Sequence, residues 1–345
     1  MKDSKITVSK GLGITLMVIG HSVIPLGVDY IYMFHMPLFF ILSGYCFIEA
    51  HLNDFKNFFI RRIKGLYKPF VLFGIIFILL HNVFYHLNIY NEFYGYSNNV
   101  SHLYTIKESI NKVIKCLLMY GDSEELLGGY WFLPQLFWAS IIGWILIKVF
   151  HNPLAGLLVA VALSIVFMKF ELQVPYTRIH KVSFMATSFF LIGFAIKKYR
   201  VKVNGWQAVD CAIIVLLGSV FFKSDMYIWN IKTVLPFLAC ATLGSLMIIR
   251  ISSFEHNIFK KPLIYIGDHT MEILTWHFLS FKLASLLIIL VEMRTIDELS
   301  QFPVIQDQTY PFWWLLYIIV GLGIPLGLVY LRYIIKRRII SHKQI

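Results

Sequence analysis

The chain has 345 residues, of which 58% are hydrophobic, 17% aromatic and only 14% charged. Soluble domains carry about 25% charged residues, so this composition excludes a soluble globular protein and indicates one embedded in a lipid bilayer. The formal net charge of +12 would suggest a nucleic-acid partner for a soluble chain. In a membrane protein it reflects the basic residues that flank the bilayer, so we expect no nucleic-acid partner.

Ten apolar stretches follow one another along the chain, each near the roughly 20 residues that a membrane-spanning helix needs. They fall near 6–26, 30–50, 70–90, 130–150, 153–169, 182–197, 206–223, 230–250, 270–292 and 312–335. No polar block of domain size interrupts them. The sequence therefore predicts an all-α, polytopic bundle of about ten transmembrane helices, forming one domain over 1–345.

Lysine and arginine are unevenly distributed between the two sides of this bundle. If the N-terminus is cytoplasmic, most of them flank the inner ends of the stretches, with clusters at 2–10, 56–68, 197–202 and 332–343. An excess of positive charge on the cytoplasmic side is typical of membrane proteins. We therefore expect both the N- and the C-terminus to be cytoplasmic.

The longest loop expected outside covers 91–129 and contains TIKESINKVIKCLLMYG (105–121). Its apolar residues recur at helical spacing and its lysines occupy the other face. This pattern predicts an amphipathic helix that lies in the membrane interface or closes over the outer mouth as a lid. A simple tethering helix fits the same pattern.

The first stretch contains KGLGITLMVIGH (10–21), with a lysine at its start and a histidine deep inside. Eleven residues make about three helical turns, so Lys10 and His21 share one helix face, about 16 Å apart. A cation inside an apolar span costs about 2.5–3.5 kcal/mol, which favours functional roles. The alternatives are a boundary lysine that reaches the interface and a core histidine bonded to a carbonyl.

A second histidine, His35, lies in IYMFHMPLFFILSGYCF (31–47). The short turn near 25–30 predicts a tight antiparallel pair of helices in which His21 and His35 approach each other. Two imidazoles can bind a metal ion, but no third ligand has suitable spacing. We therefore predict no metal site.

The run FFIRRIKGLYKPF (58–70) is basic and fits a cytoplasmic anchor. Arg61 and Arg62 would also suit a phosphorylated ligand, because guanidinium groups pair bidentately with phosphate. The run alone does not distinguish these two interpretations.

The ninth stretch opens with GDHTMEILTWHF (267–278), where Asp268 is expected to cap the helix. Glu272 and His277 then lie inside the membrane. A carboxylate there needs a partner, such as a histidine or arginine from a neighbouring helix. A proton relay in a transporter would have the same residues.

Over residues 5–280 these stretches resemble the acyltransferase-3 family of integral membrane acyltransferases, closest to its fucose-4-O-acetylase-like branch. Lys10 and His21 match the family's pattern of Lys or Arg, ten residues, then His. FHMPLFFILSGY (34–45), YWFL (130–133) and TMEILTWHF (270–278) are similar to three further motifs. The family often has Arg-x-x-Arg after the second helix, and RRIKG (61–65) departs from it, so the sequence leaves open which arginine takes that role.

The resemblance implies transfer of an acyl group, usually acetyl, from cytoplasmic acyl-CoA to a sugar hydroxyl. The acceptor would be a cell-surface glycan or its lipid-linked precursor, at the inner (plasma) membrane of a bacterial cell. Acetyl-CoA would be a donor substrate, and no bound cofactor is expected.

The same resemblance assigns roles to individual residues. His21 would deprotonate the hydroxyl, and Glu272 would orient a histidine or stabilise its imidazolium. Lys10 with Arg61 or Arg62 would hold the CoA phosphates. The residues expected on the acceptor side are His35, Trp131 and His277.

The main alternative is a proton-coupled transporter or glycan flippase, which ten spans with an intramembrane Glu and His would also suit. Against it, the sequence shows no inverted internal repeat and no paired helices broken by Gly or Pro. Consumption of acyl-CoA by the purified protein distinguishes the two.

Overall fold

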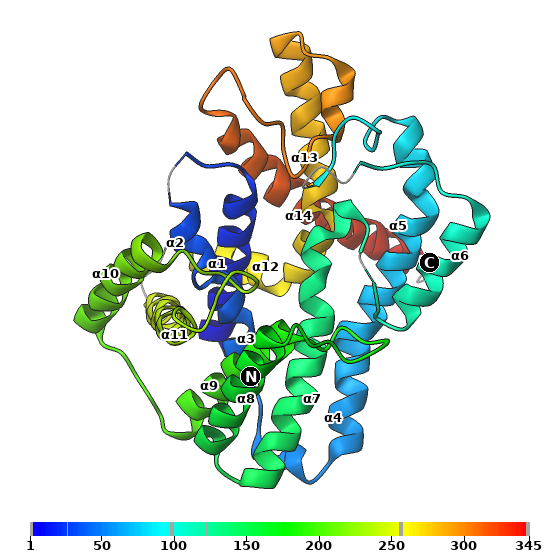
Figure 1. Ribbon diagram of the computed structural model, residues 1–345. Helices are drawn as coiled ribbons and strands as arrows, with labels where there is room; N and C mark the ends of the chain where they lie inside the picture. Colours follow the sequence, from blue (N-terminus) through cyan, green and yellow to red (C-terminus); the bar gives the residue numbers. More distant parts are fainter. Residues whose placement is uncertain (1–2, 26, 97–99, 122, 255–257, 343–345) are drawn as a thin grey trace.

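The computed structural model describes residues 3–25, 27–96, 100–121, 123–254 and 258–342, and side chains up to residue 337. Within these ranges the chain is a helical bundle with no strand, and its one β-bridge joins Gln173 and His180 (Figure 1). The all-α, polytopic architecture predicted from the sequence is confirmed.

The helices follow the chain in this order: α1 (Ser4–His21), α2 (Val28–Tyr32), α3 (His35–Tyr45), α4 (Phe55–Arg62), α5 (Lys68–His86), α6 (Ile106–Leu117), α7 (Phe132–Phe150), α8 (Pro153–Lys169), α9 (Lys181–Lys198), α10 (Gly205–Phe222), α11 (Val234–Ile251), α12 (Lys260–Asp268), α13 (Thr270–Glu292) and α14 (Trp313–His342). Short 3-10 segments are η1 (Glu49–Leu52), η4 (Glu125–Trp131) and η5 (Ile296–Ser300). A π turn, η2 (Ile63–Tyr67), joins α4 to α5.

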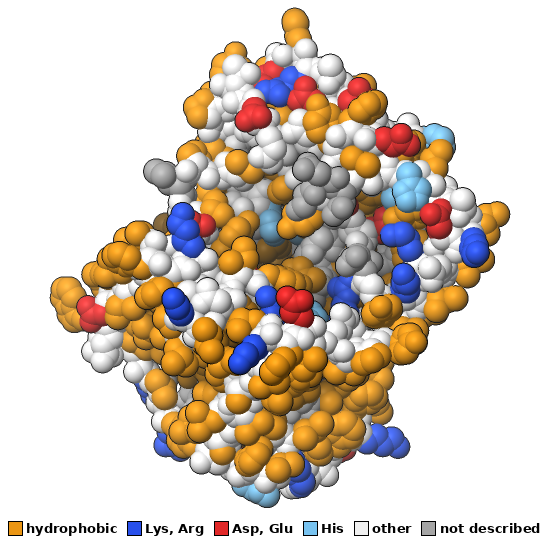
Figure 2. Space-filling view, in the orientation of Figure 1, with side chains coloured by type: hydrophobic (Ala, Val, Ile, Leu, Met, Phe, Trp, Pro, Cys, Tyr) orange, Lys and Arg blue, Asp and Glu red, His pale blue; other side chains and the backbone are white. Residues whose placement is uncertain are grey.

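Each of the ten predicted apolar stretches contains a helix. In the part of the chain that the structure describes, six helical segments are long and apolar enough to cross a membrane: Phe55–His86, Glu125–Phe150, Gly205–Phe222, Val234–Ile251, Thr270–Glu292 and Trp313–Arg337. The other four stretches form α1, α3, α8 and α9, which are shorter or less apolar. Large apolar side chains such as Leu79, Leu158 and Phe221 are exposed, and Figure 2 shows apolar side chains over much of the surface. A bilayer would cover such a surface.

The stretch predicted as one helix at 30–50 is broken, and that prediction is wrong. The break lies at Phe34 (φ −140°, ψ −17°), between α2 and α3. The 11 residues of α3 cover about 16 Å, roughly half of the hydrocarbon core of a bilayer. Pro37 fits this start of α3, because proline has no N–H to donate and is accommodated without loss of a hydrogen bond in the first turn of a helix.

The helix predicted at 70–90 begins earlier than expected. Asp54 caps α4 by accepting a hydrogen bond from the Asn57 N–H, and the helix continues through η2 into α5 without a loop. The basic run at 58–70 is therefore helical and extends a spanning segment, which fixes the directions of its two arginines.

The centre of the bundle is α9, which packs against α3, α7 and α8. Two glycines bring the backbones of α3 and α9 into direct contact. A Cβ atom on Gly44 would overlap the carbonyl oxygen of Phe190, and one on Gly193 would overlap that of Ile41. Small residues allow this close approach between membrane helices.

The helix predicted at 105–121 is present as α6. Thr105 and Glu108 form a capping box at its start, and the hydrogen bonds to Glu108 lower the pKa of this carboxyl to about 2. The helix packs along α5 and leaves Ile106 and Ile110 exposed. A role for α6 as an interfacial helix or a lid stays a prediction.

Candidate functional site

Two histidines from opposite ends of the chain meet inside the bundle. His21 is the last residue of α1, and its ring centroid lies 5.8 Å from that of His277 on α13, with the planes inclined by 27°. Phe278 packs against both imidazoles, at 5.0 Å from His21 and 3.9 Å from His277. We call these two rings the histidine pair.

The backbone fixes the tautomer of His277. Its Nδ1 lies 2.9 Å from the carbonyl oxygen of Ile273 and 3.1 Å from that of Leu274. Since carbonyl oxygens only accept hydrogen bonds, Nδ1 carries the proton. Nε2 is buried and has no hydrogen-bond partner among the described residues, so neutral His277 keeps an available lone pair beside His21.

The predicted approach of His21 to His35 is mediated by a third ring. The ring of Tyr32 lies 6.3 Å from that of His21 and 5.3 Å from that of His35. Its hydroxyl donates a 2.8 Å hydrogen bond to the carbonyl of Gly20, where a Cβ atom would lie 2.7 Å from the tyrosine ring. His35 Nδ1 bonds the carbonyl of Ile31 at 2.9 Å. The ring of Tyr32 therefore lies near both imidazoles, and His35 is close enough to His21 for their charges to interact.

The two adjacent arginines point in different directions. The guanidinium of Arg62 donates a 3.3 Å hydrogen bond to Ser43 on α3 and lies 4.9 Å from the ring centroid of Phe58. Arg61 is exposed. Of the two, Arg62 faces the bundle.

Lys10 is placed relative to Arg62 by the register of two helices. Gly20 of α1 meets Tyr32 of α2, and Gly13 meets Leu38 and Phe39 of α3, so α1 runs antiparallel to the segment that follows it. Continued by three residues along α1, this register puts Lys10 opposite Ile41 and Leu42, next to Ser43, which Arg62 contacts. Lys10 and the contact made by Arg62 therefore lie near the same end of α3, with no bond between the two cations among the described residues.

Glu272 lies in the first turn of α13 and is half-buried. No hydrogen bond or ion pair joins it to another described residue. Two backbone carbonyls orient His277 without it, and a supporting role for Glu272 stays a prediction. The predicted N-cap is wrong, because Asp268 is the last residue of α12 and the residue before α13 is His269.

Trp131 ends η4, the segment that leads into α7. Its ring lies 4.9 Å from that of Tyr227, and the neighbouring Tyr130 hydroxyl forms a buried 2.7 Å hydrogen bond with Thr275. A Cβ atom on Gly129 would lie 2.8 Å from Leu274 and 3.7 Å from His277. The η4 segment is thus fixed against α13 beside the histidine pair.

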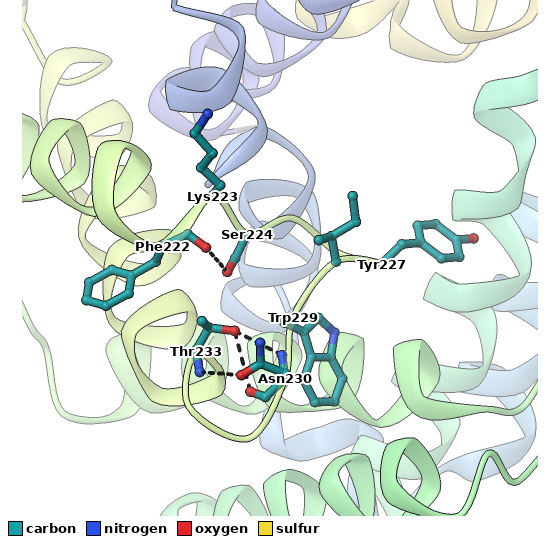
Figure 3. A pocket seen from close by; sticks show the side chains of 8 residues that line it. Phe222, Lys223, Ser224, Tyr227, Trp229, Asn230 and Thr233 are labelled. Atoms are coloured by element: carbon teal, nitrogen blue, oxygen red, sulfur yellow. Dashed lines mark hydrogen bonds between the residues drawn. The ribbon is translucent and has the colours of Figure 1, made fainter. Parts of the chain in front are cut away.

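A pocket of about 380 Å³ lies in the connection between α10 and α11, lined by Phe222, Lys223, Ser224, Tyr227, Ile228, Trp229, Asn230 and Thr233 (Figure 3). Lys223 is 3.8 Å from Asp29. None of the lining residues is a predicted site residue. We place the candidate site at the histidine pair, where the titratable groups converge, and not at this pocket.

Three residues near Phe278 are not among the site residues predicted from the sequence. Lys282 lies one helical turn after Phe278 on α13, Phe302 packs against Phe278, and Glu125 bonds the backbone of Tyr96, whose ring packs against Phe302. The sequence did give a signal for Lys282, because a charged residue inside an apolar stretch is by default a candidate functional residue. The described residues contain no group of three His, Cys, Asp or Glu side chains placed to hold a metal ion.

Residues 3–330 match the sequence profile of a family described as an acyltransferase domain. The chain belongs to the acyltransferase-3 family. Nodulation protein NolL of Mesorhizobium japonicum is 27% identical over 224 residues, which make up 60% of this chain and 50% of NolL. The chain thus matches only about half the length of this curated relative. The comparison with solved structures gave no match.

The range that matches the acyltransferase-3 profile contains every residue predicted for the site. The structure brings His21 and His277 together, and the register of α1 puts Lys10 near the end of α3 that Arg62 contacts. His35 is linked to His21 through the ring of Tyr32. Arg61 is exposed, Glu272 is half-buried, and neither is bonded to these residues.

Proposed function

We propose that this protein transfers an acyl group, most simply acetyl, from acyl-CoA to a sugar hydroxyl of a cell-surface glycan or its lipid-linked precursor, at the plasma membrane of a bacterium. One observation carries the proposal. Two imidazoles meet inside the bundle, and His277 offers a fixed and available lone pair. His21, the other member, shares a face of α1 with Lys10 about 16 Å away, and Arg62 faces the bundle through Ser43.

Acyl-CoA fits the spacing of about 16 Å between Lys10 and His21. Lys10 and Arg62 are suited to the phosphates of CoA, because guanidinium and ammonium groups form charge-assisted hydrogen bonds with phosphate. The extended arm of CoA would then lie along α1 and bring the thioester to the histidine pair.

The reaction needs a base where the hydroxyl meets the thioester. A neutral imidazole takes the proton as the hydroxyl oxygen bonds to the carbonyl carbon. The carbon–sulfur bond then breaks, and the proton passes to the departing thiolate of CoA. We assign the base to His21. His277 has a lone pair held in place by the backbone and is the partner or the alternative base.

The test uses purified protein in lipid vesicles with radiolabelled acetyl-CoA and an oligosaccharide. Transfer of label to the sugar by the wild type, and its loss in the His21→Ala variant at equal abundance, would support the proposal. Intact acetyl-CoA with vectorial movement of the oligosaccharide would replace it with the transporter.

A further inference from the structure

A wall of aromatic rings leads away from the histidine pair. Phe278 contacts His277, the ring of Phe302 lies 4.5 Å from that of Phe278, and the ring of Tyr96 lies 5.8 Å from that of Phe302. Tyr96 is exposed. These three residues, called the aromatic wall, lead from the histidine pair to the exposed ring of Tyr96.

A carboxylate lies beside this wall with one oxygen unused. Oε2 of Glu125 accepts a 3.3 Å hydrogen bond from the backbone N–H of Tyr96. Oε1 is buried and has no hydrogen-bond partner among the described residues. Leaving a buried polar atom unpaired costs about 1–3 kcal/mol, and more for a charged group, so this oxygen is expected to receive a donor that the protein does not supply.

Lys282 holds the other side of the wall. Its buried ammonium donates hydrogen bonds to the carbonyls of Leu299 (2.9 Å) and Gln301 (2.8 Å) and lies 6.0 Å from the ring centroid of Phe302. No direct ion pair joins Lys282 to Glu125, although the two charges are close enough to interact. Lys282 fixes the backbone around Phe302 through these two carbonyls.

These features select one ligand chemistry. Aromatic side chains with a few placed polar groups are typical of the lining of small-molecule sites. A carboxylate oxygen accepts hydroxyl hydrogens, and the charge of Lys282 offsets that of Glu125, so the two together offer no net charge to an ionic group. We propose that the aromatic wall and Glu125 form the binding subsite for the acceptor, and that this acceptor is a neutral sugar, one of whose hydroxyls donates to Glu125. The inference rests on the proposed function.

The subsite lies in the right place for the reaction. Phe278 belongs to both the wall and the surroundings of the histidine pair, so a sugar on the wall can present a second hydroxyl to His21. A Cβ atom on Gly128 would lie 3.2 Å from both Phe278 and Phe302. The η4 segment therefore packs against the wall and positions Glu125 beside it.

The test measures transfer from labelled acetyl-CoA in lipid vesicles, with a neutral and a uronic-acid-containing oligosaccharide as acceptors. Glu125→Gln keeps the size of the side chain, and Phe302→Leu removes a ring of the wall. We expect each variant to raise the acceptor KM at least about tenfold while the KM for acetyl-CoA is unchanged, and the neutral acceptor to be preferred by the wild type. The matched control is Glu92→Gln, an exposed glutamate bonded to Tyr85, which should change neither constant.

An unchanged acceptor KM in both variants, or a wild-type preference for the acidic acceptor, would overturn the inference. Oligosaccharide binding to the His21→Ala protein, with and without Glu125→Gln, is measured in parallel. This binding measurement distinguishes failure of the subsite from failure of the proposed function. If no acetyl group is transferred to either sugar but binding is weakened by Glu125→Gln, the subsite stands and the reaction is wrong.

Discussion

The imidazole of His277 stacks beside that of His21, with centroids 5.8 Å apart and planes inclined by 27°. The two rings differ in their constraints. The Nδ1 proton of His277 is committed to two backbone carbonyls, whereas His21 ends its helix and is enclosed by the rings of Tyr32, His277 and Phe278.

Removing either imidazole should abolish most of the transfer. General base catalysis contributes about 10²–10⁴-fold, so we expect His21→Ala to lower kcat by that factor and His277→Ala by at least tenfold. Initial rates at saturating acetyl-CoA and acceptor check this. His151→Asn, at an exposed histidine with positive φ, is the control, and full activity in His21→Ala would rule out its role as the base.

The two arginines should affect donor binding unequally. Arg62→Gln removes the guanidinium that faces α3, and a hydrogen bond to a charged group is worth about 1.5–3 kcal/mol. We expect the KM for acyl-CoA to rise about tenfold or more, with the acceptor KM unchanged. Arg61→Gln should have a smaller effect, and the opposite order would assign the phosphate contact to Arg61.

The direct contact between α3 and α9 predicts intolerance to a single methyl group. Gly44→Ala and Gly193→Ala should each destabilise the protein by about 1–3 kcal/mol, because the added atom overlaps a backbone carbonyl that cannot move easily. Thermal unfolding in detergent measures this. Gly327→Ala, where a Cβ atom meets nothing within 4 Å, should leave the melting temperature within error of the wild type.

His81 and Glu124 form a buried pair, with 2.7 Å between Nδ1 and Oε2, each side chain being only 2% exposed. Tyr104 donates to the other carboxylate oxygen at 3.0 Å. Removing one partner of a buried pair costs about 3–5 kcal/mol, so Glu124→Ala should lower the free energy of unfolding by this amount. His102→Ala, which breaks the exposed pair with Glu108, should cost less than about 1 kcal/mol, and equal losses would contradict the prediction.

His180 predicts a loss of stability in mild acid. Burial, followed by the charges of Arg178 and Lys181, lowers the pKa of His180 to about 4, whereas an unfolded histidine titrates near 6.5. Between these values the unfolded state binds more protons, so the stability contributed by neutral His180 is complete above about pH 6.5 and is lost as the pH falls toward 4. Melting temperatures at pH 7 and 5 should differ less in His180→Asn than in the wild type.

Local signals in the sequence predicted the helices well. Apolar stretches, the spacing of Lys10 and His21, and the amphipathic pattern that follows Thr105 depend on residues a few positions apart. Each of these elements is present as a helix. Hydropathy alone predicted one helix over 30–50, because it takes no account of the N–H that Pro37 lacks. Pro37 itself was visible in the sequence.

The contacts within the site depend on residues far apart in the chain and were harder to predict. Nothing near His21 indicates that its nearest imidazole is His277 and not His35, because the choice depends on Tyr32 bonding Gly20 and on η4 packing against α13. Glu272 was expected to orient a histidine. For His277, backbone carbonyls of the same helix provide the orientation, and no pattern of side chains in the sequence predicts such a contact. The role of Glu272 stays a prediction.

Helix α1 packs closely against α12 along its N-terminal half. A Cβ atom on Gly11 would overlap the carbonyl of Leu263, and one on Gly267 would overlap that of Thr7, so α1 and α12 touch backbone to backbone beside Lys10. Helix α1 is also unbroken from Ser4 to His21. If the proposed function is correct, α1 fixes the distance between the phosphates of the donor and its reacting carbonyl. A thioester with an arm shorter than that of CoA would not reach the histidine pair while its phosphates are bound, whatever acyl group it carries.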